Sequence, residues 1–220
     1  MSIAFDSVTT AFTSASSSVT VSHTCSGSNR LLIVTSTANS GQTTTGVTYN
    51  GVSMTSIGSV TDTNGATQYL WRLLAPATGA NNIVITNSGS VTAGSAVSYT
   101  GVSQSGFPDS SSATVRNSTT TSFGASTTTV ADNAWVVCTS RTGNGFALTA
   151  GANTTMRSQP ETTYLGGSAL WDTGGAQTPA GSKTVTVTCT SQFFGGEIIV
   201  SIAPVAVSFT PSPDNRMYFM

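Results

Sequence analysis

Charge is what this sequence most lacks. Only 7% of the 220 residues are Asp, Glu, Lys or Arg, and the formal net charge is −1, whereas charged residues make up about 25% of an average soluble protein. The seven Lys and Arg residues are spread singly along the chain, so no basic stripe could collect a phosphate backbone, and we expect no nucleic-acid partner. Ser and Thr make up about a third of the chain instead, which gives a surface solvated by hydroxyl groups.

Long apolar runs are also absent. The longest runs have about four or five residues, far fewer than the roughly 20 that a membrane-spanning helix requires. The opening stretch, MSIAFDSVTTAF, has no basic segment followed by an apolar one, so it does not resemble a secretory signal. We therefore expect a protein that is made without secretory targeting and that has no membrane partner.

Residues that carry metal or acid–base chemistry are few. The single histidine, His23, lies in an alternating strand pattern, and no Gly-x-Ser-x-Gly motif supplies a nucleophile for it, so we expect a structural histidine. The three cysteines form no Cys-x-x-Cys pair that would indicate a metal site. Whether two of them pair in a disulfide stays open: Cys25, Cys138 and Cys189.

The eight acidic residues are scattered, and most lie in turn-like contexts where Asp accepts hydrogen bonds from the nearby backbone. The stretch DTNG (62–65) is typical of a turn rather than of a calcium loop. Glu197 lies within the apolar segment GGEIIVSI, where we expect a solvent-facing residue at a strand edge or start, the alternative being a buried acid. Glycoside hydrolysis needs two facing carboxylates, which this pattern does not indicate. We predict no enzyme, no catalytic residue, no metal and no cofactor.

Strand signals recur along the chain, whereas helical periodicity is nearly absent. Residues 18–24 alternate between apolar and polar side chains, and residues 30–37 form a continuous apolar run that suggests a central strand. Asn50-Gly51, within residues 46–60, predicts a β-hairpin. Further strand candidates follow at 67–75, 81–88 and 93–102. The fold class is therefore all-β with antiparallel pairing, because no helical crossover is present to join parallel strands.

The second half of the chain repeats this order of segments at an offset of about 100 residues, so that Leu170-Trp171 corresponds to Leu70-Trp71. We predict an antiparallel, jelly-roll-like β-sandwich over residues 1–203, built from two diverged repeats of about 100 residues, about 1–102 and about 121–203. Each half could close as its own small sandwich, or the halves could pair their strands. We favour pairing, because no linker separates them.

Three tryptophans and the end of the chain are the remaining candidates for contact. Trp71, Trp135 and Trp171 could form a platform for sugar rings, but they lie in apolar strand segments, so we predict structural core residues. Residues 204–220 contain prolines that favour an extended C-terminal arm. Its last residues would cost solubility if exposed, so we predict that they contact a partner: Met217, Tyr218, Phe219 and Met220.

Residues 28–102, including SNRLLIVTSTANSGQTTTGVTYNGVSMTSIGSV and LWRLLAPATGANNIVITNSGS, resemble small Ser/Thr-rich β-sandwich proteins of tailed phages and bacterial metagenomes. The second half looks like a diverged copy of the first. The resemblance implies a virion structural role and carries over no catalytic or binding residues.

We therefore expect a non-enzymatic virion protein, assembled in the host cytoplasm. Its most specific form is a capsid decoration protein that stabilises the head and is anchored partly by the arm. Its partners would be the major capsid protein or another virion protein, and other copies of itself. We expect a trimer, since capsid lattices have three-fold and six-fold symmetry. The alternative function is a carbohydrate-binding or adhesin-type module of a phage tail or cell surface.

Overall fold

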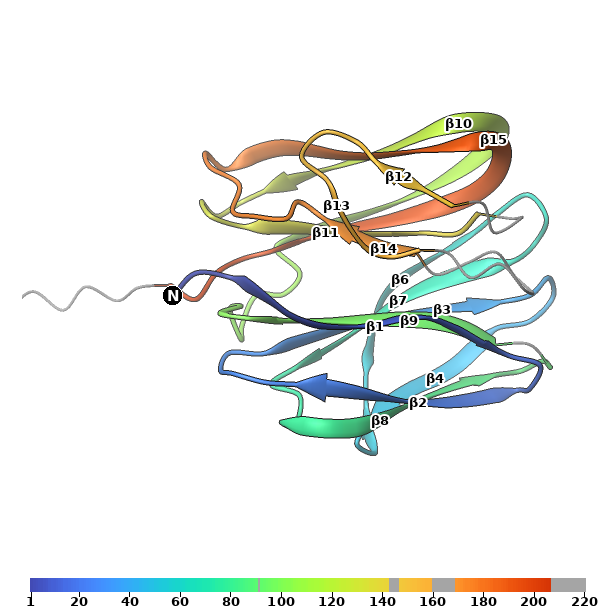
Figure 1. Ribbon diagram of the computed structural model, residues 1–220, viewed down its shortest axis with the longest axis horizontal. Coiled ribbons are helices and arrows are strands. Elements are labelled where there is room, and N and C mark those ends of the chain that lie inside the picture. The colour runs from blue at the N-terminus through green and yellow to red at the C-terminus, as the bar shows by residue number, and fades with distance from the viewer. Residues whose placement is uncertain (91, 143–146, 160–168, 207–220) are drawn as a thin grey trace, which may run out of the picture.

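The computed structural model describes residues 1–90, 92–142, 147–159 and 169–206. Every regular element within these ranges is a β-strand, and all strand pairs are antiparallel, as the sequence predicts. The described residues contain no helix of the length and apolarity needed to cross a membrane. Figure 1 shows the strands stacked in layers, with the strands of the first half in the lower part and the strands of the second half in the upper part.

Two sheets are formed by the first half. One has the order β1-β9-β3-β7-β6 and the other has the order β2-β8-β4-β5. The bounds of these strands are β1 Ala4–Ser14, β2 Ser18–Cys25, β3 Leu31–Ala38, β4 Thr44–Tyr49, β5 Val52–Ser53, β6 Thr55–Thr61, β7 Thr67–Leu74, β8 Gly79–Asn87 and β9 Thr92–Thr100.

The second half has the strand order β10-β15-β11-β14-β13, with β12 paired to β15. Two of its strands are long enough to belong to two layers. Residues 110–116 of β10 pair with 195–201 of β15, whereas 122–129 pair with 181–188, where β12 also joins. The bounds are β10 Ser110–Thr129, β11 Trp135–Ser140, β12 Thr149–Ala150, β13 Thr155–Ser158, β14 Ala169–Asp172 and β15 Gly181–Ile202.

Every ladder among the described residues pairs strands of the same half. The prediction that the two halves pair their strands with each other is therefore wrong. The one described bridge between the halves joins Val102 to Pro204. The halves meet face to face instead. The sheet that contains β3 packs against the sheet that contains β11, and side chains of both sheets share one buried apolar cluster.

Strand β3 shows why the continuous apolar run predicts a central strand. It pairs with β7 on one side and β9 on the other, and all its residues are buried. Leu31 and Ile33 point into the cluster between the halves, whereas Leu32 and Val34 point into the core of the first half. Successive side chains of a strand face opposite sides, so a strand covered on both faces needs apolar residues at every position.

Two turns follow directly from their sequences. Asn50 and Gly51 both have positive φ, 50° and 75°, as the hairpin between β4 and β5 requires. In the DTNG stretch the Asp62 carboxylate accepts hydrogen bonds from the backbone of Asn64 and Ala66, at 2.9 and 3.1 Å. Both the predicted hairpin and the predicted turn are confirmed.

Candidate functional site

The three tryptophans are buried, each in a different core cluster. Trp71 is 9% exposed and lies in the core of the first half, and Trp171 is fully buried in that of the second half. Trp135 is 7% exposed and lies in the cluster between the halves. A sugar ring stacks on an exposed aromatic face, which these side chains do not offer.

The start of the predicted arm, at Pro204 and Val205, is held against the first half. Val205 N–H donates to the Gly101 carbonyl at 3.0 Å, and Ser103 N–H donates to the Ala203 carbonyl at 2.8 Å. A cavity of about 320 Å³ adjoins this segment, lined by Met1, Ser2, Asn133, Ala176, Pro204 and Val205. The four residues predicted to contact a partner, Met217, Tyr218, Phe219 and Met220, lie outside the described residues.

His23 lies where the edge strands of the two first-half sheets, β1 and β2, meet. It is 2% exposed, with Nε2 at 3.3 Å from Ser7 Oγ and Nδ1 at 2.9 Å from Thr9 Oγ1. Burial lowers the pKa of His23 to about 4, an effect that the Asp6 carboxylate partly opposes. The neutral ring therefore prevails at neutral pH, and the buried, hydrogen-bonded environment of His23 is the one expected for a structural histidine.

Ser7 lies between β1 and β2. Its Oγ is within hydrogen-bond distance of the Thr24 carbonyl, at 2.5 Å, and of His23 Nε2, at 3.3 Å. The Ser7–His23 contact therefore joins β1 to β2.

Asp6 completes this polar cluster. Its carboxylate accepts hydrogen bonds from Ser26 N–H at 2.9 Å and from Ser98 Oγ at 2.7 Å, and it also accepts from Ser26 Oγ. Partial burial acts to raise the pKa of Asp6, but these hydrogen bonds and the charge of His23 lower it below its usual value.

Asp172 joins the two halves. It is fully buried at the end of β14 and accepts a hydrogen bond from Tyr99 Oη on β9, at 2.7 Å. Arg157 on β13 donates to the same carboxylate through Nε at 2.7 Å and Nη2 at 3.1 Å. The Arg157 guanidinium also lies over the Phe5 ring, 4.2 Å from its centroid. Burial, followed by the charge of Asp172, raises the pKa of Tyr99 well above its usual value.

A second polar group crosses the same interface. Asp62, in the turn after β6, forms an ion pair with Arg141 of the second half. Nearby, Gln68 Nε2 donates to Thr139 Oγ1 at 2.6 Å. The hydrogen-bonded ion pairs are buried together with the apolar cluster, so the halves form one interface in which polar contacts fix the relative position of the sheets.

Two acidic residues differ from what the sequence indicates. Glu197 is 1% exposed, because it lies between Thr114 of β10 and Ser140 of β11, so the prediction of a solvent-facing residue is wrong. Asp172 is a strand residue rather than a turn residue. In both cases the sequence offered one signal, a charged residue next to an apolar strand segment. A charged side chain in such a place can be buried when a polar partner compensates for its lost hydration.

The cysteines and acidic residues do not gather. Cys25, Cys138 and Cys189 are all free and buried, so no disulfide forms between them. Within the described ranges, no group of three or more His, Cys, Asp or Glu residues could hold a metal ion.

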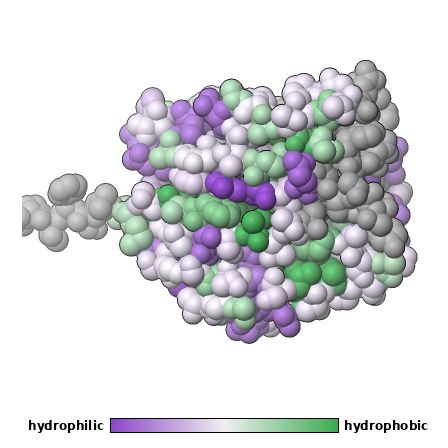
Figure 2. Space-filling view, viewed as in Figure 1, coloured by the Kyte–Doolittle hydropathy of each residue, from purple (hydrophilic) through white to green (hydrophobic). Residues whose placement is uncertain are grey.

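Figure 2 shows a face on which small purple and green areas are interspersed among pale, weakly polar residues.

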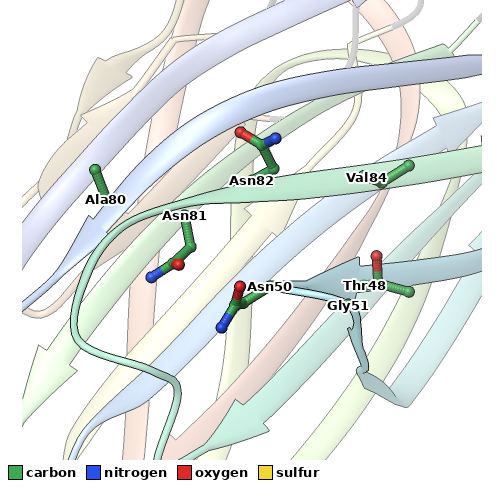
Figure 3. Close-up of a pocket in the computed structure, with 7 residues that line it drawn as sticks. All are labelled: Thr48, Asn50, Gly51, Ala80, Asn81, Asn82 and Val84. Carbon is green, nitrogen blue, oxygen red and sulfur yellow. The ribbon is translucent and has the colours of Figure 1, made fainter.

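A cavity of about 410 Å³ lies where the β4–β5 hairpin meets β8. Asn50 N–H donates to the Asn82 carbonyl at 3.0 Å, which holds the hairpin against β8. Figure 3 shows Asn81 and Asn82 pointing to opposite sides of β8. This cavity, lined mainly by amide and hydroxyl groups, is the candidate ligand site: Thr48, Asn50, Gly51, Ala80, Asn81, Asn82 and Val84. Sequence reasoning did not find it, since the Asn-Gly pair indicates only the turn.

The chain matches no protein-family model, no curated protein and no solved structure.

Proposed function

We propose that this protein is a non-enzymatic structural protein of a virion, most specifically a phage capsid decoration protein that stabilises the head. The observation that carries the proposal is the interface between the halves, where a shared apolar cluster encloses hydrogen-bonded ion pairs. Such an interface makes a stiff block from two sandwiches, because well-packed interiors resist deformation. A stiff block with a surface rich in hydroxyl groups suits a protein that covers and reinforces a shell.

We propose further that each half is a jelly roll and that the halves arose by duplication. In a jelly roll, strands alternate between two sheets, and the last strand returns beside the first. The orders β1-β9-β3-β7 and β2-β8-β4-β5 support this description of the first half. The order β10-β15-β11-β14 repeats the first of them in the second half. Jelly rolls are common in viral capsid domains and in lectins.

Residues 204–220 serve in this proposal as an anchoring arm. The segment up to Val205 is fixed by its hydrogen bond to Gly101, next to the chain's first residues. The arm therefore starts at a defined place on the block. Its last four residues, 217–220, supply Met and aromatic side chains that can fill an apolar pocket of a partner. The partner would be the major capsid protein or another virion protein, and a trimer would match a three-fold lattice position.

The test is binding to virus particles that lack this protein. Deletion of residues 211–220 should abolish binding, whereas the far-UV circular dichroism and the thermal unfolding midpoint stay unchanged. A milder variant replaces the four residues 217–220 by serine and keeps the length of the arm. Binding by either variant at the level of the full chain would contradict the anchoring role, and absence of the full chain from purified particles would contradict the virion role.

A further inference from the structure

The sheet that carries the amide-lined cavity has no charged side chain. Strands β2, β4, β5 and β8 contain no Asp, Glu, Lys or Arg, and their one histidine, His23, is buried and neutral. A phosphate or a carboxylate entering the cavity would therefore meet no opposite charge on the strands that form it. Since charged ligands gain their affinity from charge-assisted hydrogen bonds, the cavity favours a neutral ligand.

The lining presents hydrogen-bonding groups that the protein itself does not use. The side chains of Thr48, Asn50 and Asn82 make no hydrogen bond to the rest of the described chain. An Asn side chain offers one acceptor oxygen and two N–H donors, and a Thr hydroxyl offers both functions. These groups can pair with a ligand whose own groups both donate and accept.

Other contacts hold this lining in place. Asn81 Nδ2 lies within hydrogen-bond distance of Tyr49 Oη at 3.3 Å, the Thr78 carbonyl at 3.2 Å and the Gly79 carbonyl at 3.3 Å. Tyr49 is itself fully buried beneath the sheet. These contacts fix the start of β8, the strand that carries Asn82, whereas the side chains of Thr48, Asn50 and Asn82 lose rotational freedom when a ligand binds.

We propose that this cavity binds a neutral saccharide through a single pyranose ring. Sugar hydroxyls both donate and accept, which matches the amides of Asn50 and Asn82 and the hydroxyl of Thr48. Ala80 and Val84 supply apolar contact for the C–H groups of the ring. The volume of about 410 Å³ falls within the range of small-molecule sites. The site is formed by β4, by the turn between β4 and β5, and by β8, so none of its residues belongs to the proposed arm, residues 204–220.

The experiment is saturation-transfer NMR on the full chain. The probes are glucose, galactose, mannose and N-acetylglucosamine, with glucose 6-phosphate and sialyllactose as charged comparators. We expect at least one neutral sugar to bind with a dissociation constant of about 1 mM. Binding should perturb the backbone amide signals of Thr48 and Asn82 in a heteronuclear correlation spectrum.

Asn82→Ala should weaken this binding at least about tenfold, which corresponds to about 1.4 kcal/mol. The matched control is Thr86→Ala, an exposed residue on the same strand and the same outward face but outside the cavity, and it should bind as the unaltered chain does. Both variants should keep the unfolding midpoint, since both side chains are exposed. The proposal is overturned if no neutral sugar binds at about 20 mM, if the charged comparators bind more tightly, or if the two variants weaken binding equally. None of these results bears on particle binding.

Discussion

The buried imidazole of His23 should make the protein lose stability in mild acid. The perturbation is a change from about pH 7.5 to about pH 4.5, a range in which a histidine of ordinary pKa, 6.5, becomes charged. In the folded chain the pKa of His23 is lowered to about 4, so the folded state resists the proton that the unfolded state accepts. Stability is therefore complete above pH 6.5 and declines as the pH falls toward 4.

The magnitude follows from the difference between the two pKa values. A difference of this size corresponds to a loss of about 3 kcal/mol, most of which is reached by about pH 4.5. Urea unfolding, followed by circular dichroism at several pH values between these limits, measures the change in the free energy of unfolding. The pKa of Asp6 is lowered, so its own titration lies below this range.

The control is His23→Gln, which cannot take up a proton in this range but can still form hydrogen bonds with Ser7 and Thr9. Its free energy of unfolding should be lower at neutral pH and nearly constant between about pH 7.5 and about pH 4.5. If this variant lost as much stability in acid as the unaltered chain, the assignment of the effect to His23 would be refuted. A histidine that titrates in the folded protein near 6.5, followed by NMR, would refute the lowered pKa directly.

Three further results are expected from the buried contacts. Gly196→Ala should destabilise the protein by about 1–3 kcal/mol in urea unfolding, because the added Cβ would lie 2.5 Å from a methyl group of Val60, across the interface between the halves. Gly58→Ala, where nothing lies within 4 Å, should cost much less, and equal losses would contradict the close approach. Arg157→Ala leaves the Asp172 carboxylate buried without its ion-pair partner and should cost about 3–5 kcal/mol, and a loss below about 1 kcal/mol would argue against a buried pair. The three free, buried cysteines should react with a thiol reagent only after unfolding, and rapid reaction of the folded chain would contradict their burial.

Local patterns were enough to predict most strands and their tightest turn. The alternation in β2 and the apolar run in β3 each reflect how many faces of the strand are covered. Asn50-Gly51 predicted its hairpin because few other residues accept positive φ at both positions. The burial of the tryptophans followed from their apolar neighbours.

The interface and the candidate site could not be predicted in the same way. Asp172 and Tyr99 are 73 positions apart in the sequence, and nothing local to either residue specifies the other. Glu197 looked like a strand-edge residue, because its burial depends on strands β10 and β11, which come from elsewhere in the chain. The cavity likewise combines residues of the hairpin with residues of β8.

By itself, the sequence determined that this protein is all-β and where most of its strands run, and it marked residues 30–37 as a strand covered on both faces, because the period of apolar residues reports burial directly. Only the tertiary structure decided that strands pair within each half and that the halves meet face to face, with the Tyr99–Asp172 hydrogen bond and the Asp62–Arg141 ion pair between them. The physical reason is that apolar burial is not directional. A buried face can be covered by any apolar partner, and the choice is made by the packing and the hydrogen bonds that the assembled sheets allow.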